Sequence, residues 1–195
     1  AGCDSRGTQS TERLEGDKWI VNGSKIFITN SATPMTLGST IQVITGENNG
    51  KPEFTTFLIE NDTEGFSQEP MHRKMMWRAS NTGKLTFNNV ELPKENMLGK
   101  PGQGSHIMLA TLDGGRLSIA AMGLGCAQGA YEMALAYSQK REQFGKQICK
   151  FQAVSFKLAD MAMKIEAARC LLYKACRIKD AGLPYGKEAA MAKLY

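Results

Sequence analysis

The hydrophobic period of this chain changes once, near residue 104, and this change constrains the fold more than any single motif. Before residue 90, short apolar segments alternate with turn-rich stretches; after residue 104, apolar residues recur at three- and four-residue steps. Short strands with no helix between them favour an antiparallel sheet, and long helices joined by a short turn favour a bundle. We therefore expect an α+β chain, with an antiparallel β-barrel or sandwich domain in residues 1–97 and part of an up-and-down helical bundle in residues 98–195.

The strongest local signal in the first half is the dipeptide Asn22-Gly23, which separates the apolar runs 19–21 and 24–29. Asn-Gly between two such runs is typical of a β-hairpin, because both residues of a type I′ turn need a positive φ. We expect a hairpin at this point. Further strands are expected at 40–45, 54–60, 66–70 and 84–88.

Two long antiparallel helices are expected in the second half. The first begins at Ser105, which can cap it, and runs to about residue 141. The second ends before Gly182 and Pro184 and carries a regular apolar stripe. The stripe consists of Val154, Leu158, Met161, Ile165, Ala168, Leu172 and Ala175. A third helix begins near residue 187, and because the chain stops inside that pattern and starts without Met, we expect both ends to be cut.

Composition excludes several classes of function. Lys and Arg outnumber Asp and Glu by 24 to 19, but they are scattered, so no nucleic-acid partner is expected. The five cysteines show no C-x-x-C spacing and there are only two histidines, so we expect neither a metal site nor a Ser-His-Asp triad. No apolar run of about 18 to 20 residues and no signal region are evident. We therefore expect no membrane span and a cytoplasmic protein.

A glycine-rich segment at 123–129 is similar to a dinucleotide-binding fingerprint, but no strand precedes it and it lies within the first long helix. Small residues that allow close helix packing explain this segment better.

Six segments, taken in order, resemble the acyl-CoA dehydrogenase family. They are Gly2-Cys3-Asp4, 21–30, 112–116, 141–146, 151–153 and 157–161. The resemblance covers essentially the whole chain and implies the middle β-domain of that family followed by the first part of its C-terminal helical domain. It also implies FAD as cofactor, an acyl-CoA substrate, electron-transfer flavoprotein as partner, and a homo-oligomer, either a dimer or a tetramer.

The resemblance places three residues beside the flavin. Phe27 takes the position of an aromatic that shields the ring, usually Trp in the family, and Ile28 and Thr29 follow it, with the Thr29 hydroxyl and backbone N–H at the flavin edge. A flavin ring needs an apolar wall and a donor near the atoms that gain negative charge on reduction. Without the flanking match, a core phenylalanine and an ordinary strand threonine would be the better interpretation.

Cys3 stands where the family usually has Ser, in a loop that contacts the FAD pyrophosphate and lies near the acyl-CoA. A thiol is a weaker hydrogen-bond donor than a hydroxyl, so this contact is expected to be weaker.

Two further groups follow from the resemblance. Asp113, Gly114, Gly115 and Arg116 are implied to contact the acyl-CoA, although Asp113 and Arg116 could form no more than an intrahelical ion pair. Two adjacent glycines are poor helix formers, so we expect a ligand or a neighbouring helix to approach there.

Arg141, Phe144 and Gln152 lie in the turn between the two long helices. The resemblance implies that this turn reaches the FAD of a neighbouring subunit. A basic helix C-terminus that interacts favourably with the helix dipole is the alternative.

No residue of the chain is expected to be the catalytic base. The reaction, oxidation of acyl-CoA to 2-enoyl-CoA, needs a glutamate that removes a proton beside the thioester. A minority of the family carries it just before the arginine, at the position of Gly115, and the majority carries it further along the chain. We therefore expect these 195 residues to be inactive alone.

Three alternatives remain open at this point. An acyl-CoA oxidase or an enoyl-CoA reductase could be built on the same fold. The loop 71–80 has Met75-Met76 where a Leu-Gly pair is common in the family, which leaves the acyl chain length open. A non-catalytic assembly module, a β-barrel joined to a helical hairpin, is an alternative of a different class, and flavin binding would exclude it.

Overall fold

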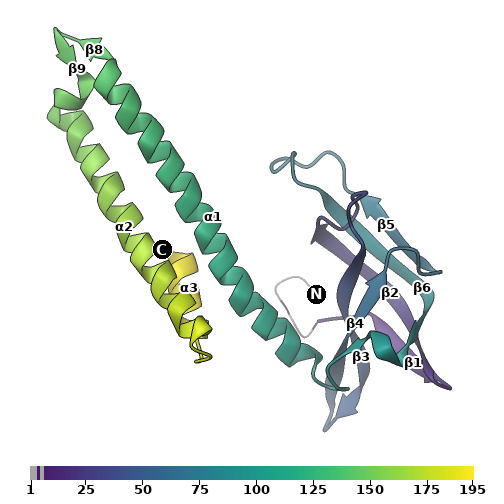
Figure 1. The fold of residues 1–195 in the computed structure, drawn as a ribbon. Coiled ribbons are helices and arrows are strands. Elements are labelled where there is room, and N and C mark those ends of the chain that lie inside the picture. The colour runs from purple at the N-terminus through teal and green to yellow at the C-terminus, as the bar shows by residue number, and fades with distance from the viewer. Residues whose placement is uncertain (1–3, 5–6) are drawn as a thin grey trace. The chain divides into compact units, whose positions relative to one another are not determined.

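The computed structural model describes Asp4 and residues 7–195. The chain divides into two compact units, Ala1–Leu109 and Ala110–Tyr195. In the described part of the first unit, the strands form one sheet in the order β5-β6-β2-β1-β3-β4-β7 (Figure 1). Their bounds are β1 Thr11–Glu15, β2 Lys18–Thr29, β3 Gly38–Asn48, β4 Lys51–Glu60, β5 Phe66–Pro70, β6 Thr82–Pro93 and β7 Met97–Leu98.

The expected antiparallel sheet domain is confirmed, with one parallel contact in it. β1 pairs antiparallel with β2 but parallel with β3, where Thr11 lies opposite Ile44. The expected strand 66–70 has the predicted bounds, and the other three expected strands lie inside longer strands. β5 and β7 form the two edges of the sheet.

The core of this unit is built by side chains that alternate along the strands. Val43, Phe57 and Ile59 are fully buried, and the Trp19 ring packs 5.6 Å from the Phe57 ring, centroid to centroid. The rings of Phe66 and Phe87 stack at 5.3 Å. This alternation of buried and exposed residues is what a half-buried sheet requires.

The predicted hairpin at Asn22-Gly23 is wrong. β2 runs through both residues, and the register with β6 shifts between Val21 and Gly23, which marks a β-bulge. Gly23 has φ 133°, and a Cβ added there would lie 2.6 Å from the Ser10 Oγ. The glycine is therefore needed for a close approach of the chain before β1.

Two tight hairpins of the first unit form on either side of this dipeptide in the chain. Gly16 and Asp17 connect β1 to β2, and β1 is a strand that the sequence analysis missed. The other dipeptide of the same kind, Asn49-Gly50, has φ values of 51° and 74° and joins β3 to β4. These are the positive φ values that a type I′ turn requires.

The predicted helices of the second half are confirmed. α1 spans Gly104–Lys140, α2 Gln152–Asp180 and α3 Gly186–Leu194. Ser105 lies inside the first turn of α1 rather than before it. A small hairpin of β8 (Glu142–Gln143) and β9 (Lys146–Gln147) follows α1, and a short 3-10 helix, Ile148–Lys150, precedes α2.

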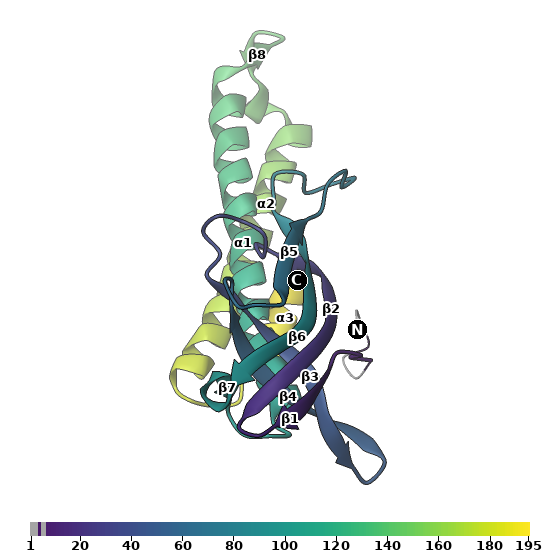
Figure 2. The same ribbon diagram turned by 90° about the vertical axis from the view of Figure 1, so that its right-hand side faces the viewer.

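Within the second unit, α1 and α2 run antiparallel and side by side, as both views show (Figures 1 and 2). Leu117 of α1, Leu172 and Ala175 of α2, and Ala189 and Ala192 of α3 form its buried cluster. The predicted stripe of α2 faces this cluster and α1, since its members are buried or half-buried. The α2 stripe is thus confirmed as the packing face.

α1 is covered on little of its surface by the described residues. Among its larger apolar side chains, Leu112, Ile119 and Met122 are about half exposed and Met133 is more so. The close packing expected at 123–129 is not made by these residues, because a Cβ added at Gly123, Gly125 or Gly129 would meet nothing within 4 Å.

By length and composition, α1 is also the one helix among the described residues that could cross a membrane. This finding by itself does not contradict the expectation of no membrane span. Helices of soluble bundles meet the same criterion.

Candidate functional site

The end of β2 is distorted at Phe27. The register between β2 and β6 shifts between Lys25 and Ile28, so Ile26 and Phe27 form a second bulge. Phe27 has φ 63°, a conformation that costs a non-glycine residue about 1 to 2 kcal/mol. Its side chain is 68% exposed, so Phe27 is not a core residue. A strained bulge that turns an aromatic ring out of the sheet is typical of a functional surface.

Ile28 and Thr29 return to the ladder, opposite Gly83 and Thr82 of β6. Ile28 packs against the core, and Thr29 is exposed. The Thr29 hydroxyl donates to no group within the described residues, which leaves it free to meet a ligand.

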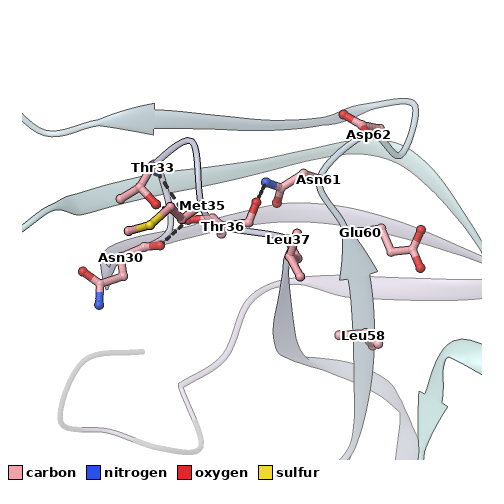
Figure 3. Close-up of a pocket in the computed structure, with 10 residues that line it drawn as sticks. Asn30, Thr33, Met35, Thr36, Leu37, Leu58, Glu60, Asn61 and Asp62 are labelled. Atoms are coloured by element: carbon pink, nitrogen blue, oxygen red, sulfur yellow. Dashed lines mark hydrogen bonds between the residues drawn. The ribbon is translucent and has the colours of Figure 1, made fainter.

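The loop after β2 is held in place by side-chain hydrogen bonds (Figure 3). The Thr36 hydroxyl donates to the Asn30 carbonyl at 2.5 Å, and the Asn61 amide donates to the Thr36 carbonyl. The loop borders an open hollow of about 980 Å³ between the ends of β2, β3 and β4. Met35 and Leu37 are both more than 85% exposed there. The sequence analysis missed this hollow, because the loop residues follow no strand or helix period.

Two partly buried ionisable groups near β2, Glu12 and Lys25, have pKa values shifted by burial. Burial raises the pKa of Glu12 from 4.5 to about 7, and the Glu12 Oε2 has no hydrogen-bond partner among the described residues. Burial also lowers the pKa of Lys25, whose Nζ donates to the Gln42 backbone carbonyl at 2.7 Å. Neither group was singled out from the sequence.

Lys74 connects the two ends of the loop 71–80 through hydrogen bonds. The Lys74 Nζ donates to the Ser80 carbonyl and, at 2.9 Å, to the Thr82 hydroxyl. Met75, Met76 and Trp77 are exposed at its tip.

In the second unit, Asp113 and Arg116 form the expected ion pair on α1. A Cβ at Gly114 would lie 3.8 Å from the Tyr185 Oη, whereas one at Gly115 would meet nothing within 4 Å. Tyr185, just before α3, therefore approaches the backbone at Gly114. The surface at Gly115 is open, and it lies beside a guanidinium that the Asp113 carboxylate orients.

The turn between α1 and α2 brings together Arg141, Phe144 and Gln152. The Ile148 N–H donates to the Arg141 carbonyl at 2.8 Å, which closes the β8–β9 hairpin onto the end of α1. Phe144 sits at the tip with φ 55° and is 92% exposed, and its ring meets the Phe151 ring edge-on at 6.1 Å. The Phe144 ring is therefore available for contact with another surface.

Arg116 lies on α1, and Arg141 directly follows the last residue of that helix, Lys140. At a rise of ~1.5 Å per residue they are separated by roughly 38 Å along α1. The two groups of one chain therefore cannot contact the same small part of a ligand. Cys3, the remaining predicted residue, lies outside the described residues.

Comparison with known proteins adds to this geometry. A family model described as the acyl-CoA dehydrogenase middle domain matches residues 1–90, and one described as the acyl-CoA dehydrogenase C-terminal domain matches residues 102–195. The chain belongs to the acyl-CoA dehydrogenase family. The resemblance drawn from the six sequence segments is thereby confirmed.

Individual acyl-CoA dehydrogenases are similar over the whole chain. The short-chain specific acyl-CoA dehydrogenase of Clostridium acetobutylicum is 46% identical over 100% of this chain and 51% of its own length. The butyryl-CoA dehydrogenase structure from Megasphaera elsdenii superposes with a TM-score of 0.91 at 44% identity, over 98% of this chain and 50% of that one. A chain in a structure described as electron transferring flavoprotein of Acidaminococcus fermentans gives 0.90 at 46% identity, over 98% and 50%. The chain spans about half the length of the relatives it matches.

Proposed function

We propose that the full-length protein is an FAD-dependent acyl-CoA dehydrogenase that oxidises a short-chain acyl-CoA to the 2-enoyl-CoA and passes the electrons to an electron-transfer flavoprotein. Family membership supports the reaction class. The relatives from Clostridium acetobutylicum and Megasphaera elsdenii carry short-chain or butyryl-CoA specificity in their names, which supports the substrate class.

The observation that carries this proposal is the bulge at Phe27. Its ring is exposed on a strained backbone two residues before Thr29, whose hydroxyl donates to no group among the described residues, and an apolar wall with a donor nearby in the chain fits the face and edge of a flavin. FAD would supply the hydride acceptor. Phe27 would exclude water from one face of the ring, Ile28 would hold the bulge against the core, and Thr29 would donate a hydrogen bond at the flavin edge. Cys3 would join them at the pyrophosphate.

The proposed acyl-CoA contacts lie on α1. Arg116 would hold a fixed positive charge toward the substrate, with its direction set by Asp113. Gly114 and Gly115 would allow the substrate to approach the helix backbone, and Gly115 has the open space for it. Since Gly115 cannot accept a proton, the base would come from a part of the full-length protein outside these residues.

The proposed enzyme is a homo-oligomer with shared sites. Arg141, Phe144 and Gln152 lie roughly 38 Å along α1 from the proposed acyl-CoA contacts, so we infer that they serve the FAD of a neighbouring subunit. That contact would bury the Phe144 ring, which is exposed in the single chain.

The proposed domain division follows the sequence expectation, with the flavin-facing sheet in 1–97 and the helices in 98–195. The exposed apolar face of α1 would be covered by further helices of the bundle and by neighbouring subunits. On this proposal α1 spans no membrane, and the enzyme is a soluble cytoplasmic protein.

The test uses the full-length protein purified without added cofactor. We expect a flavin absorption band that bleaches anaerobically with butyryl-CoA and less with long-chain acyl-CoA. Bleaching followed by rapid recolouring in air would favour an oxidase. Reduction of enoyl-CoA by a reduced carrier, with no bleaching by acyl-CoA, would favour a reductase. A protein that takes up no FAD on reconstitution would contradict the proposal and favour an assembly module.

A further inference from the structure

We propose that Lys25 is a positioning residue for the flavin-facing end of β2, because its ammonium ties β2 to β3 directly before the bulge at Phe27, which Thr29 follows in the ladder. This inference rests on the proposed function. No part of the family resemblance assigns a role to Lys25.

The tie crosses a place where the sheet ladder is interrupted. β1 lies between β2 and β3, but it begins at Thr11, opposite Asn22 of β2 and Ile44 of β3. Beyond this point, the end of β2 and the start of β3 have no regular strand between them. The Lys25 Nζ spans this gap and donates to the Gln42 backbone carbonyl at 2.7 Å.

Among the described residues, Thr8 and Ser10 of the irregular segment before β1 lie near this gap. Thr8 and Ser10 are buried there, the Ser10 carbonyl accepts from the Ile44 N–H at 2.9 Å, and the Ser10 hydroxyl lies 3.4 Å from the Ser24 carbonyl. These contacts end at Ser24. Among the described residues, the hydrogen bond from Lys25 to β3 therefore lies directly before the register shift at Phe27.

The position of Lys25 is energetically unusual. It lies opposite Leu85, which is 1% exposed, so its stem points toward the core side of the sheet. Burial lowers the pKa of Lys25, and no carboxylate contributes to the shift. A half-buried ammonium that bonds a backbone carbonyl costs more than the same side chain in water. This cost is offset if the ammonium holds two backbone segments at a defined separation.

The same strand provides a matched comparison. Lys18 also lies on β2, but it is exposed and pairs with Glu91 at 2.7 Å on the neighbouring strand β6. Exposed pairs of this kind contribute little to stability. Substitution of Lys18 is therefore the control: it removes a lysine from β2 that does not connect β2 to β3.

The experiment compares Lys25→Met with Lys18→Met and Lys25→Arg in the full-length protein. Loss of a hydrogen bond to a charged group changes an equilibrium by about 10- to 100-fold, and here the equilibrium concerned is that between the bulge geometry that accepts the flavin and others. We expect Lys25→Met to raise the FAD dissociation constant by such a factor and to shift the visible band of the flavin even at saturating FAD. Lys18→Met should match the wild type in both measurements, and Lys25→Arg should restore part of the affinity.

The visible absorption band of the flavin at saturating FAD distinguishes a residue that positions the flavin site from one that only stabilises the fold. A merely structural lysine would lower the melting temperature of the apoprotein and leave the bound spectrum unchanged, and that result would overturn the inference. If Lys25→Met does not fold, Lys25→Gln, which is too short to reach the Gln42 carbonyl, replaces it with the same expectations. A wild type that binds no FAD would overturn the proposed function as well, whereas a wild type that binds FAD beside an unchanged Lys25→Met would overturn this inference alone.

Discussion

Glu12 lies opposite Val21 in the pairing of β1 with β2, so its side chain points to the core side of the sheet. Its Oε2 is buried and has no hydrogen-bond partner in the part of the chain that the structure describes, and burial raises the pKa of Glu12 to about 7. A carboxyl group with a folded-state pKa above its unfolded value resists ionisation in the fold. Below about pH 4.5 both states are protonated and no penalty exists; between about pH 4.5 and 7 the penalty grows, so stability falls as the pH rises.

We therefore expect Glu12→Gln to stabilise the protein at pH 8 relative to the wild type and to have little effect at pH 4.5. A fully buried carboxyl with this shift would lose ~3 kcal/mol at ~1.4 kcal/mol per pH unit, and solvent access to the rest of this side chain reduces the expected gain to about 1 kcal/mol. Urea denaturation of both proteins at several pH values measures the difference. A constant difference across that range would contradict the assigned pKa.

At the scale of elements, two Asn-Gly dipeptides with the same local preference have different structures. Asn49-Gly50 forms the two-residue turn between β3 and β4, whereas Asn22-Gly23 lies within β2. The side chain of Asn22 explains part of the difference: its Oδ1 accepts from the Asn89 N–H at 2.8 Å, and its amide donates to the Asn89 Oδ1 at 3.1 Å. Pairing of β2 with a strand on each side outweighs the turn preference.

Substitution of the two glycines tests this difference. A Cβ added at Gly50 would meet nothing within 4 Å. Gly50→Ala should therefore lower the free energy of unfolding by about 1 kcal/mol, the cost of a positive φ at a residue with a Cβ. Gly23→Ala places a Cβ within 3 Å of three Ser10 atoms and should cost several kcal/mol, in the range of overpacked sites. Thermal unfolding of each variant gives the comparison. Equal losses would mean that Ser10 moves aside freely, and a Gly23→Ala, Ser10→Gly double variant should recover part of the loss.

For the whole molecule, the separation between the two groups of helix residues predicts shared sites. Phe27→Ala would remove the proposed wall of the flavin ring on β2. Arg141→Met would remove the proposed contact from the turn between α1 and α2 to the FAD of the neighbouring subunit. A homo-oligomer of either variant should therefore retain little FAD. In a dimer that contains one copy of each, one site combines both defects and the other is intact.

We expect mixed dimers, purified through two different tags, to retain about half of the wild-type flavin. Absorbance of the bound flavin per subunit measures it, and dimers of Phe27→Ala alone, taken through the same tags, are the control. Mixed dimers that hold no more flavin than either variant would show that each site is built from a single chain.

The periods of the two halves were sufficient to predict the sheet domain, the strand at 66–70 and all three helices, because apolar spacing responds mainly to which face is buried. The resemblance of six short segments was sufficient for the family. The positions of Phe27 and Thr29 beside a flavin remain a prediction, and the structure adds that Phe27 is exposed on a bulge.

Features that depend on neighbours in space were not accessible from the sequence. β1 was missed because its five residues, Thr11–Glu15, are mostly exposed and carry no apolar alternation. The bulge at Gly23 depends on the approach of Ser10, and the tie from Lys25 depends on where β1 begins. Local preference acts through a few adjacent residues, whereas these features result from contacts between segments that meet only once the sheet has formed.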